Sequence, residues 1–294
     1  MCLGSTMDNN HSFHKIWDIF KPFVIYYVLY SAVFILIISL CRTVAQVLGN
    51  EYQVYLTEHA ETVTGLVSGL SMVIGVLPLI PMLRRELAEH KLSVGGTAHD
   101  GSPEAKNGQD TKSGKSGIMI IQAALTVLLA VSSSLGLNVV LALTGIVESS
   151  ANYQDVAAQQ YSVAFGAGML LFGLISPITE EIVFRGLVFN CMRRYFPHAA
   201  AVAASGVLFG IYHGNLVQGL YGGCMGILMA YLYERMHSFF IPCLFHATAN
   251  LVVYMAARNM ALQRRFFTPS GCAALLAVSV VCIIAVEFLG RKVQ

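Results

Sequence analysis

Two adjacent glutamates, Glu180 and Glu181, lie inside an apolar stretch of the sequence. A charged side chain at the centre of a bilayer costs at least about 2.5–3.5 kcal/mol, so such residues are candidates for function. Carboxylates in this setting suit proton transfer. Arg185 follows Glu181 by four residues and is expected to pair with it along one helix face, in a supporting role.

Two histidines fall within other apolar stretches, and each has a partner four residues away. Asn250 follows His246, and Phe209 precedes His213. Residues four apart share a helix face. His246 and Asn250 are therefore expected to point into one cavity, with Phe209 forming a wall beside His213.

Depth in the membrane is consistent with one shared site. With a rise of about 1.5 Å per residue, Glu180 lies about 21 Å and His213 about 22 Å from the neighbouring cytoplasmic corner. His246 and Asn250 lie about 12 Å and about 18 Å deep by the same rise of about 1.5 Å. Pro177 predicts a break in the helix just before the glutamates.

The inventory of carboxylate, imidazole and amide groups suits the activation of water. Glu180 is expected to act as general base with His213, while His246 and Asn250 donate hydrogen bonds to an oxyanion. Taken singly, each histidine is better explained as a helix–helix hydrogen-bonding residue. The convergence of five polar groups at similar depth on three helices favours the water-activating role. A zinc site of two histidines and Glu180 is a less favoured alternative, because the spacing His-Glu-x-x-His is absent.

The composition predicts an all-α, polytopic membrane helical bundle. Only 12% of the 294 residues are charged, and 56% are hydrophobic. Stretches near the 20 or so residues that a membrane helix needs predict about eight transmembrane helices. They lie at about 22–41, 63–83, 118–145, 161–178, 199–213, 216–233, 239–256 and 271–289.

The positive-inside rule orients this bundle with both termini in the cytoplasm. Thirteen basic residues then fall on the cytoplasmic side: Lys15, Lys21, Arg84, Arg85, Lys91, Lys106, Lys112, Lys115, Arg193, Arg194, Arg235, Arg291 and Lys292. Four fall on the other side, namely Arg42, Arg258, Arg264 and Arg265. The net charge of +2 gives no indication of a nucleic-acid partner.

One change of composition suggests a domain boundary. Residues 84–117 are rich in Gly, Ser, Lys, Asp and Asn and predict a flexible cytoplasmic loop. Residues 1–117 are therefore expected to form an N-terminal two-helix region that includes this loop. Residues 118–294 are expected to form the functional core, because nearly all the unusual polar residues lie there.

Together the motifs resemble those of a known family. Glu180-Glu181-x-x-x-Arg185, Phe209-x-x-x-His213 and His246-x-x-x-Asn250 occur in the order found in the CAAX prenyl protease and bacteriocin-processing family of intramembrane glutamic endopeptidases. The resemblance covers about residues 165–255.

This resemblance implies an endopeptidase of the bacterial plasma membrane that cleaves a peptide or protein, prenylated or not. It implies Glu180 and His213 as the water-activating pair, His246 and Asn250 as the oxyanion site, and no cofactor. Two other classes stay open. One is a non-catalytic bacteriocin-immunity or scaffold protein, and the other is a proton-coupled transporter that uses the same polar groups as a relay.

Overall fold

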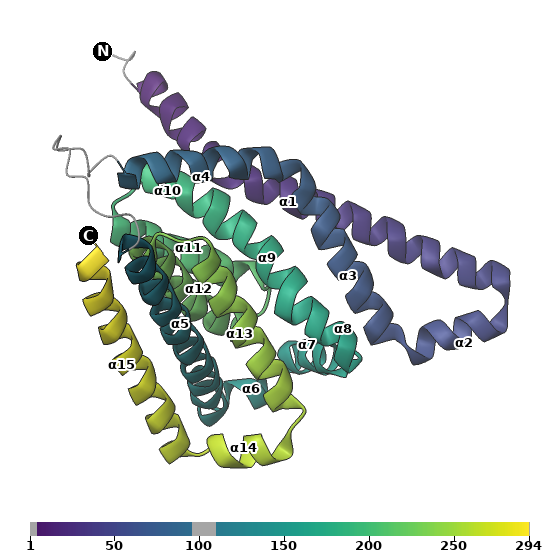
Figure 1. Ribbon diagram of the computed structural model, residues 1–294. Helices are drawn as coiled ribbons and strands as arrows, with labels where there is room; N and C mark the ends of the chain where they lie inside the picture. Colours follow the sequence, from purple (N-terminus) through teal and green to yellow (C-terminus); the bar gives the residue numbers. More distant parts are fainter. Residues whose placement is uncertain (1–4, 96–109, 294) are drawn as a thin grey trace. The chain divides into compact units, whose positions relative to one another are not determined.

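The computed structural model (Figure 1) describes the backbone of residues 5–95 and 110–293, and the side chains of residues 14–89 and 117–289. Within these ranges every regular element is a helix, and no strand occurs. Seven helical segments are long and apolar enough to cross a membrane: His14–Leu48, Ala60–Glu89, Gly117–Leu143, Phe165–Tyr195, Leu216–Met236, Phe240–Ala257 and Pro269–Leu289. A shorter apolar helix, His198–Tyr212, lies at the remaining predicted position. The protein is an all-α, multi-pass membrane protein, as predicted.

The chain forms two compact units, each built from two separate segments. The first unit consists of the residues up to Glu86 together with Ala151–Ser205, and the second of Leu87–Ser150 together with the residues from Gly206 onward. The predicted boundary at residue 117 concerns function, and it stays a prediction.

The first unit is organised around the packing of α1 against α3. The Tyr30 hydroxyl of α1 lies 3.1 Å from the Ser68 hydroxyl of α3. Gly75 allows a close approach, because a Cβ atom there would lie 3.1 Å from the backbone nitrogen of Tyr30. A 3₁₀ turn, Leu77–Leu79, joins α3 to α4. The helices of this unit are α1 (Ser5–Leu48), α2 (Asn50–Glu58), α3 (Ala60–Val76), α4 (Ile80–Gly95, which continues into the second unit), α7 (Ala151–Ser162), α8 (Phe165–Leu170), α9 (Ser176–Glu181), α10 (Asn190–Tyr195) and the start of α11 (His198–Tyr212).

The segment that carries the two glutamates is one continuous helix, so the predicted break at Pro177 is wrong. Helical structure runs from Phe165 to Tyr195 and includes two π-helical stretches, Leu171–Ile175 and Ile182–Phe189. A proline clashes with the carbonyl four residues earlier, here that of Gly173. This carbonyl lies in the first wide π turn. The helix therefore accommodates the proline by widening rather than by breaking.

Part of the predicted loop, residues 84–117, is helical. Helix α4 continues to Gly95, and α5 begins at Asp110. Residues 96–109 of the predicted loop lie outside the described residues. Arg84, Arg85 and Ala88 are good helix formers, so the polar composition of this part does not end the helix.

The second unit is built around α5, which packs against α13 and α15. A buried hydrogen bond of 2.9 Å joins the hydroxyls of Ser279 on α15 and Ser132 on α5. Near the other end of α15, Glu287 accepts hydrogen bonds from Arg235, at 2.8 Å, and from the Tyr231 hydroxyl of α12. The helices of this unit are α5 (Asp110–Leu143), α6 (Ile146–Ser149), the end of α11, α12 (Leu216–Met236), α13 (Phe240–Ala257), α14 (Met260–Phe266) and α15 (Pro269–Val293).

Glycines bring the backbones of α11 and α12 into direct contact. A Cβ atom on Gly210 would lie 2.4 Å from the carbonyl oxygen of Gly219, and one on Gly206 would lie 2.7 Å from the backbone nitrogen of Ile227. The spacing of four residues predicts this close packing of membrane helices. The contact fixes the end of α11 against α12.

We expect Gly210→Ala to destabilise the protein, because the new methyl group can be accommodated only if the two backbones separate. Overpacking of this kind costs about 1–3 kcal/mol and lowers the midpoint of thermal unfolding by several degrees. The measurement is thermal unfolding of detergent-purified protein. Gly219→Ala is the control, because its Cβ atom would lie an ordinary 3.4 Å from the nearest atom. Equal midpoints for the two variants would contradict the expected effect.

Candidate functional site

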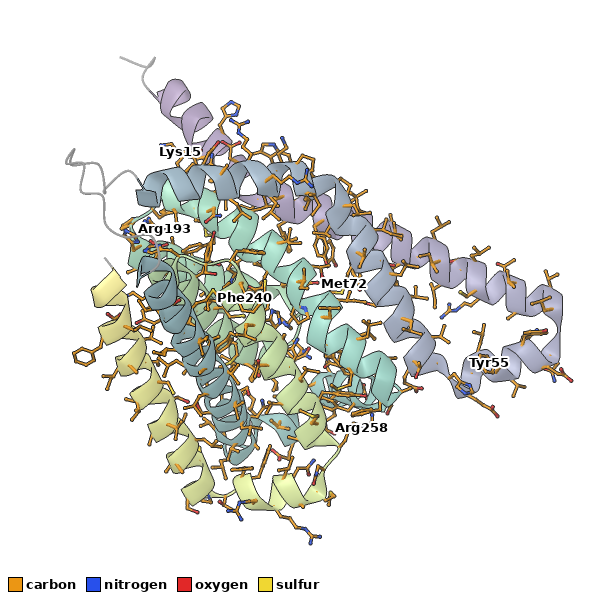
Figure 2. All side chains as sticks on the ribbon, viewed as in Figure 1. Lys15, Tyr55, Met72, Arg193, Phe240 and Arg258 are labelled. Carbon is orange, nitrogen blue, oxygen red and sulfur yellow. The ribbon has the colours of Figure 1, made fainter. Side chains whose placement is uncertain are left out.

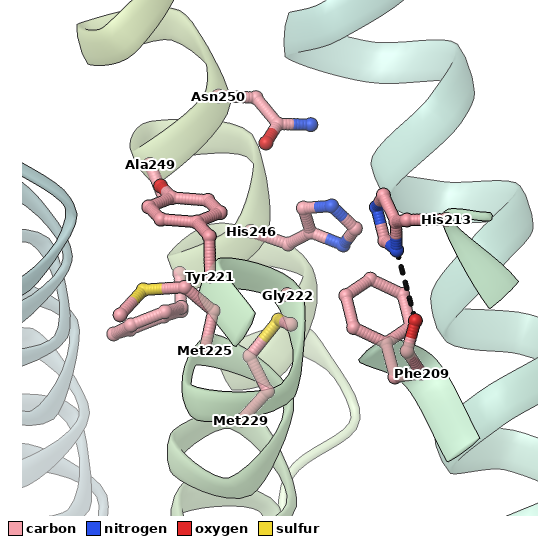
Figure 3. A pocket seen from close by; sticks show the side chains of 10 residues that line it. Phe209, His213, Tyr221, Gly222, Met225, Met229, His246, Ala249 and Asn250 are labelled. Carbon is pink, nitrogen blue, oxygen red and sulfur yellow. Dashed lines mark hydrogen bonds between the residues drawn. The ribbon is translucent and has the colours of Figure 1, made fainter. Parts of the chain in front are cut away.

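The second unit contains a small cavity between the end of α11 and the facing sides of α12 and α13 (Figure 3). Its volume is about 30 Å³. This is room for roughly two water molecules or one small polar group, and far too little for an isoprenoid chain. The cavity is lined by Phe209, His213, Tyr221, Gly222, Met225, Met229, Phe245, His246, Ala249 and Asn250.

His213 reaches the cavity because α11 ends just before it. Gly214 has a φ of +73°, in the left-handed region that glycine adopts without strain, and this turns the chain towards α12. Asn215 caps α12 by accepting a hydrogen bond of 2.9 Å from the backbone N–H of Gln218. The Asn215 amide in turn donates to the Gln218 side-chain oxygen at 2.6 Å. The N-cap bond and the bond between the two side chains fix the turn that carries His213.

The orientation of the His213 ring determines which nitrogen can act as a base. Its Nδ1 lies 2.8 Å from the carbonyl oxygen of Phe209. A carbonyl oxygen can only accept, so Nδ1 must carry the proton in this hydrogen bond. The lone pair of the neutral ring is therefore on Nε2. A histidine held in this tautomer can accept a proton or a hydrogen bond through Nε2.

Phe209 also positions both imidazoles through its ring. Its side chain is 2% exposed. The ring centroid lies 4.9 Å from that of His213 and 5.5 Å from that of His246, and both contacts are edge-to-face. Asn250 lies one helical turn after His246 and lines the same cavity, as the spacing predicts (Figure 3). One buried aromatic side chain thus contacts histidines from two different helices.

Gly222 of α12 forms a floor beneath the His213 ring. A Cβ atom at this position would lie 3.1 Å from both Nδ1 and Cε1 of His213. That distance is shorter than ordinary van der Waals contact, so any larger residue would push the ring away from its place against Phe209. Nothing in the sequence indicates that Gly222 supports a candidate catalytic ring.

The carboxylates form a second group, on one helix of the first unit. The Glu181 and Arg185 side chains are both fully buried, and Nη1 of Arg185 lies 2.8 Å from Oε1 of Glu181. The ion pair predicted from their spacing is thus present. Glu180 is 5% exposed, and its Oε1 accepts a hydrogen bond of 2.7 Å from the Ser176 hydroxyl. Ser176 therefore orients the Glu180 carboxylate, a role that its position four residues earlier could have indicated.

The predicted site residues thus fall into two groups. His213, His246, Asn250 and Phe209 line the cavity of the second unit. Glu180, Glu181 and Arg185 belong to the first unit. The apolar lining of the cavity, to which Met225 and Phe245 contribute, was not identified from the sequence, because large apolar residues of membrane helices carry no signal of their own.

The cavity by itself does not fit a zinc ion. A catalytic zinc site uses three protein ligands from among His, Cys, Asp and Glu. The cavity offers two such side chains, His213 and His246, and the remaining polar groups in its lining are an amide and a phenol. No group of three potential ligands is found among the side chains described. The zinc alternative, with Glu180 as a third ligand, stays a prediction.

We expect Arg185→Leu to be strongly destabilising, because it leaves the Glu181 carboxylate buried without its cation. Removal of one partner of a buried ion pair typically costs about 3–5 kcal/mol. The measurement is the thermal unfolding midpoint in detergent. The double variant Glu181→Gln/Arg185→Leu, which removes both charges, should recover much of the loss. A wild-type midpoint for Arg185→Leu alone would show that the pair does not stabilise this helix.

Comparisons with known proteins agree with the sequence motifs. Residues 162–252 match the family model described as type II CAAX prenyl endopeptidase Rce1-like. The chain is also 32% identical over 85 residues to YdiL of Bacillus subtilis (strain 168), which is named as a candidate membrane peptidase. This match covers 29% of the chain and 35% of the relative, so the chain spans about a third of the length of that protein. No solved structure matches the chain.

Both matched regions are limited in extent, and the family match includes all three motifs, from Glu180 to Asn250. Residues 162–252 therefore resemble the Rce1-like type II CAAX prenyl endopeptidases, as the three motifs predict.

Proposed function

We propose that the protein is an intramembrane endopeptidase that hydrolyses a peptide bond with a water molecule activated by Glu180 and His213. The observation that carries the proposal is the water-sized cavity, into which His213 presents a nitrogen held in the proton-accepting tautomer. The match to an endopeptidase family over the same residues supports this chemistry.

Three residues of the cavity, together with Glu180 of the first unit, have a direct role in the proposed reaction. His213 Nε2 accepts a hydrogen bond from the water molecule and holds it. Glu180 accepts the proton of this water as the hydroxide attacks the carbonyl carbon of the substrate. His246 and Asn250 donate hydrogen bonds to the oxyanion that forms. The proton held by Glu180 then passes to the amine that leaves when the C–N bond breaks.

The supporting residues keep these groups in place. Ser176 orients Glu180 by a hydrogen bond. Arg185 lowers the free-energy cost of burying the second carboxylate, that of Glu181. Phe209 holds both imidazoles. The proposal requires the Glu180 carboxylate to contact the water molecule that His213 holds in the cavity. It also places both termini in the cytoplasm, following the distribution of Lys and Arg.

The substrate class follows in part from the size of the cavity. A volume of about 30 Å³ holds roughly two water molecules or one small polar group such as a peptide carbonyl, but no lipid chain. If the substrate is a prenylated CAAX protein, its isoprenoid must therefore bind outside this cavity. We propose a peptide or protein substrate, and the choice between prenylated and unprenylated forms is left to the assay below.

We expect Glu180→Gln to lower peptide cleavage by roughly 100- to 10,000-fold, the usual contribution of a general base. The assay uses detergent-purified protein with two fluorogenic substrates, a prenylated CAAX peptide and an unprenylated peptide library, each with and without a zinc chelator. Glu234→Gln is the control, because Glu234 belongs to α12 but does not line the cavity.

The outcomes of this assay separate the alternatives. Cleavage that resists the chelator and is lost only in Glu180→Gln supports the glutamate mechanism. Cleavage lost with the chelator and restored by zinc favours the zinc version. Wild-type cleavage by an inserted Glu180→Gln protein would contradict both. If the wild-type protein cleaves neither substrate, the result favours the alternatives, namely a non-catalytic immunity or scaffold protein or a proton-coupled transporter.

We expect Gly222→Ala to lower kcat by roughly tenfold or more with little change in KM, because the new methyl group displaces His213 from its hydrogen bond to Phe209. Gly223→Ala is the control. Its Cβ atom would lie 3.7 Å from the nearest atom, the Gly206 carbonyl oxygen. Equal activity of the two variants would show that Gly222 does not position His213.

A further inference from the structure

Helix α14 lies between two candidate membrane spans of the second unit. It connects α13, which ends at Ala257, to α15, which begins at Pro269, and both are long and apolar enough to span the membrane. A helix between the ends of two antiparallel spans must lie at the boundary between hydrocarbon and water. Figure 2 shows Arg258 where α13 leads into this connection.

The inner face of α14 is fixed to the end of α13. The Gln263 amide donates hydrogen bonds of 3.1 Å and 3.0 Å to the carbonyl oxygens of Ala256 and Ala257. The Asn259 side chain caps α14 by accepting from the backbone N–H groups of Ala261 and Leu262. These bonds satisfy the carbonyls at the end of α13 and set the rotation of α14 about its axis.

With Gln263 turned inward, α14 and its flank expose both basic and apolar side chains. Arg264 and Arg265 are exposed. Met260 is 64% exposed, and Leu262 and Phe267 are 38% and 40% exposed. Exposed apolar and basic side chains beside the ends of two membrane spans suit contact with both the acyl and the phosphate regions of a bilayer.

The charge at this end of the unit is positive. Residues 251–286 contain three arginines and no Asp or Glu. The short helix α6 lies at the same end of the unit and contributes one acidic residue, Glu148 (Figure 1). The Arg258 guanidinium lies over the Tyr254 ring, at 5.3 Å, and donates to its hydroxyl. Arg264 and Arg265 are therefore the cations turned outward from α14.

We propose that α14 is a binding surface for the phosphate groups of anionic phospholipids. Arg264 and Arg265 contact the phosphates, while Met260, Leu262 and Phe267 enter the adjacent acyl region. Anionic lipid at this surface accounts for basic residues that depart from the charge distribution used to orient the bundle. The surface does not include any residue of the cavity, so the proposal stands apart from the proposed peptidase activity.

The test is a lipid titration of the detergent-purified full chain, with bound lipid counted by native mass spectrometry. Phosphatidylglycerol is compared with phosphatidylcholine of the same acyl chains. We expect tighter binding of phosphatidylglycerol to the wild-type protein. Arg264→Gln/Arg265→Gln should weaken that binding by roughly thirtyfold, because each arginine near an anionic surface contributes roughly fivefold. Phosphatidylcholine binding should not change.

Two matched variants test the assignment. Arg264→Lys/Arg265→Lys keeps the charge and should retain binding within a fewfold of wild type. Arg84→Gln/Arg85→Gln removes two exposed arginines from α4 and should leave the tight phosphatidylglycerol site intact. The proposal is overturned if the glutamine pair on α14 binds phosphatidylglycerol like the wild type, or if the α4 variant loses binding to the same extent.

Discussion

The chemistry of the cavity depends on one hydrogen bond, from His213 Nδ1 to the carbonyl oxygen of Phe209. It places the proton on Nδ1 and leaves Nε2 able to accept. The bond forms because α11 ends at Tyr212, one residue before His213, and Gly214 then reverses the chain. It persists because Gly222 leaves room for the ring and nothing more. Local backbone geometry and the closeness of α12 together determine the tautomer of a proposed catalytic residue.

The second constraint is the cost of charge in an apolar helix. Glu181 and Arg185 offset that cost for one another, and the Ser176 hydroxyl satisfies one oxygen of Glu180. The π-helical turns keep the segment continuous despite Pro177. The cavity of the second unit is small as well, about the size of the reacting atoms. Recognition of a larger substrate must therefore use other surfaces of the protein.

Much of the fold could be predicted from hydropathy, because the length of a membrane-spanning helix is set by the bilayer. The pairs four residues apart were also predictable, and they place Asn250 beside His246 and Glu181 beside Arg185. The continuity of the helix at Pro177 could not be predicted, because the helix tolerates this proline only through a local change to π-helical hydrogen bonding. The role of Gly222 was hidden as well, since it depends on which face of α12 meets His213.

The central claim is that Glu180 and His213 act on one water molecule, and a double-mutant cycle on peptide cleavage tests it most directly. The rates to compare are those of the wild type, Glu180→Gln, His213→Ala and the double variant. Residues that act as a unit lose nearly all their contribution with either single change. The double variant is therefore predicted to be about as slow as the slower single variant. Losses that multiply in the double variant would contradict the claim.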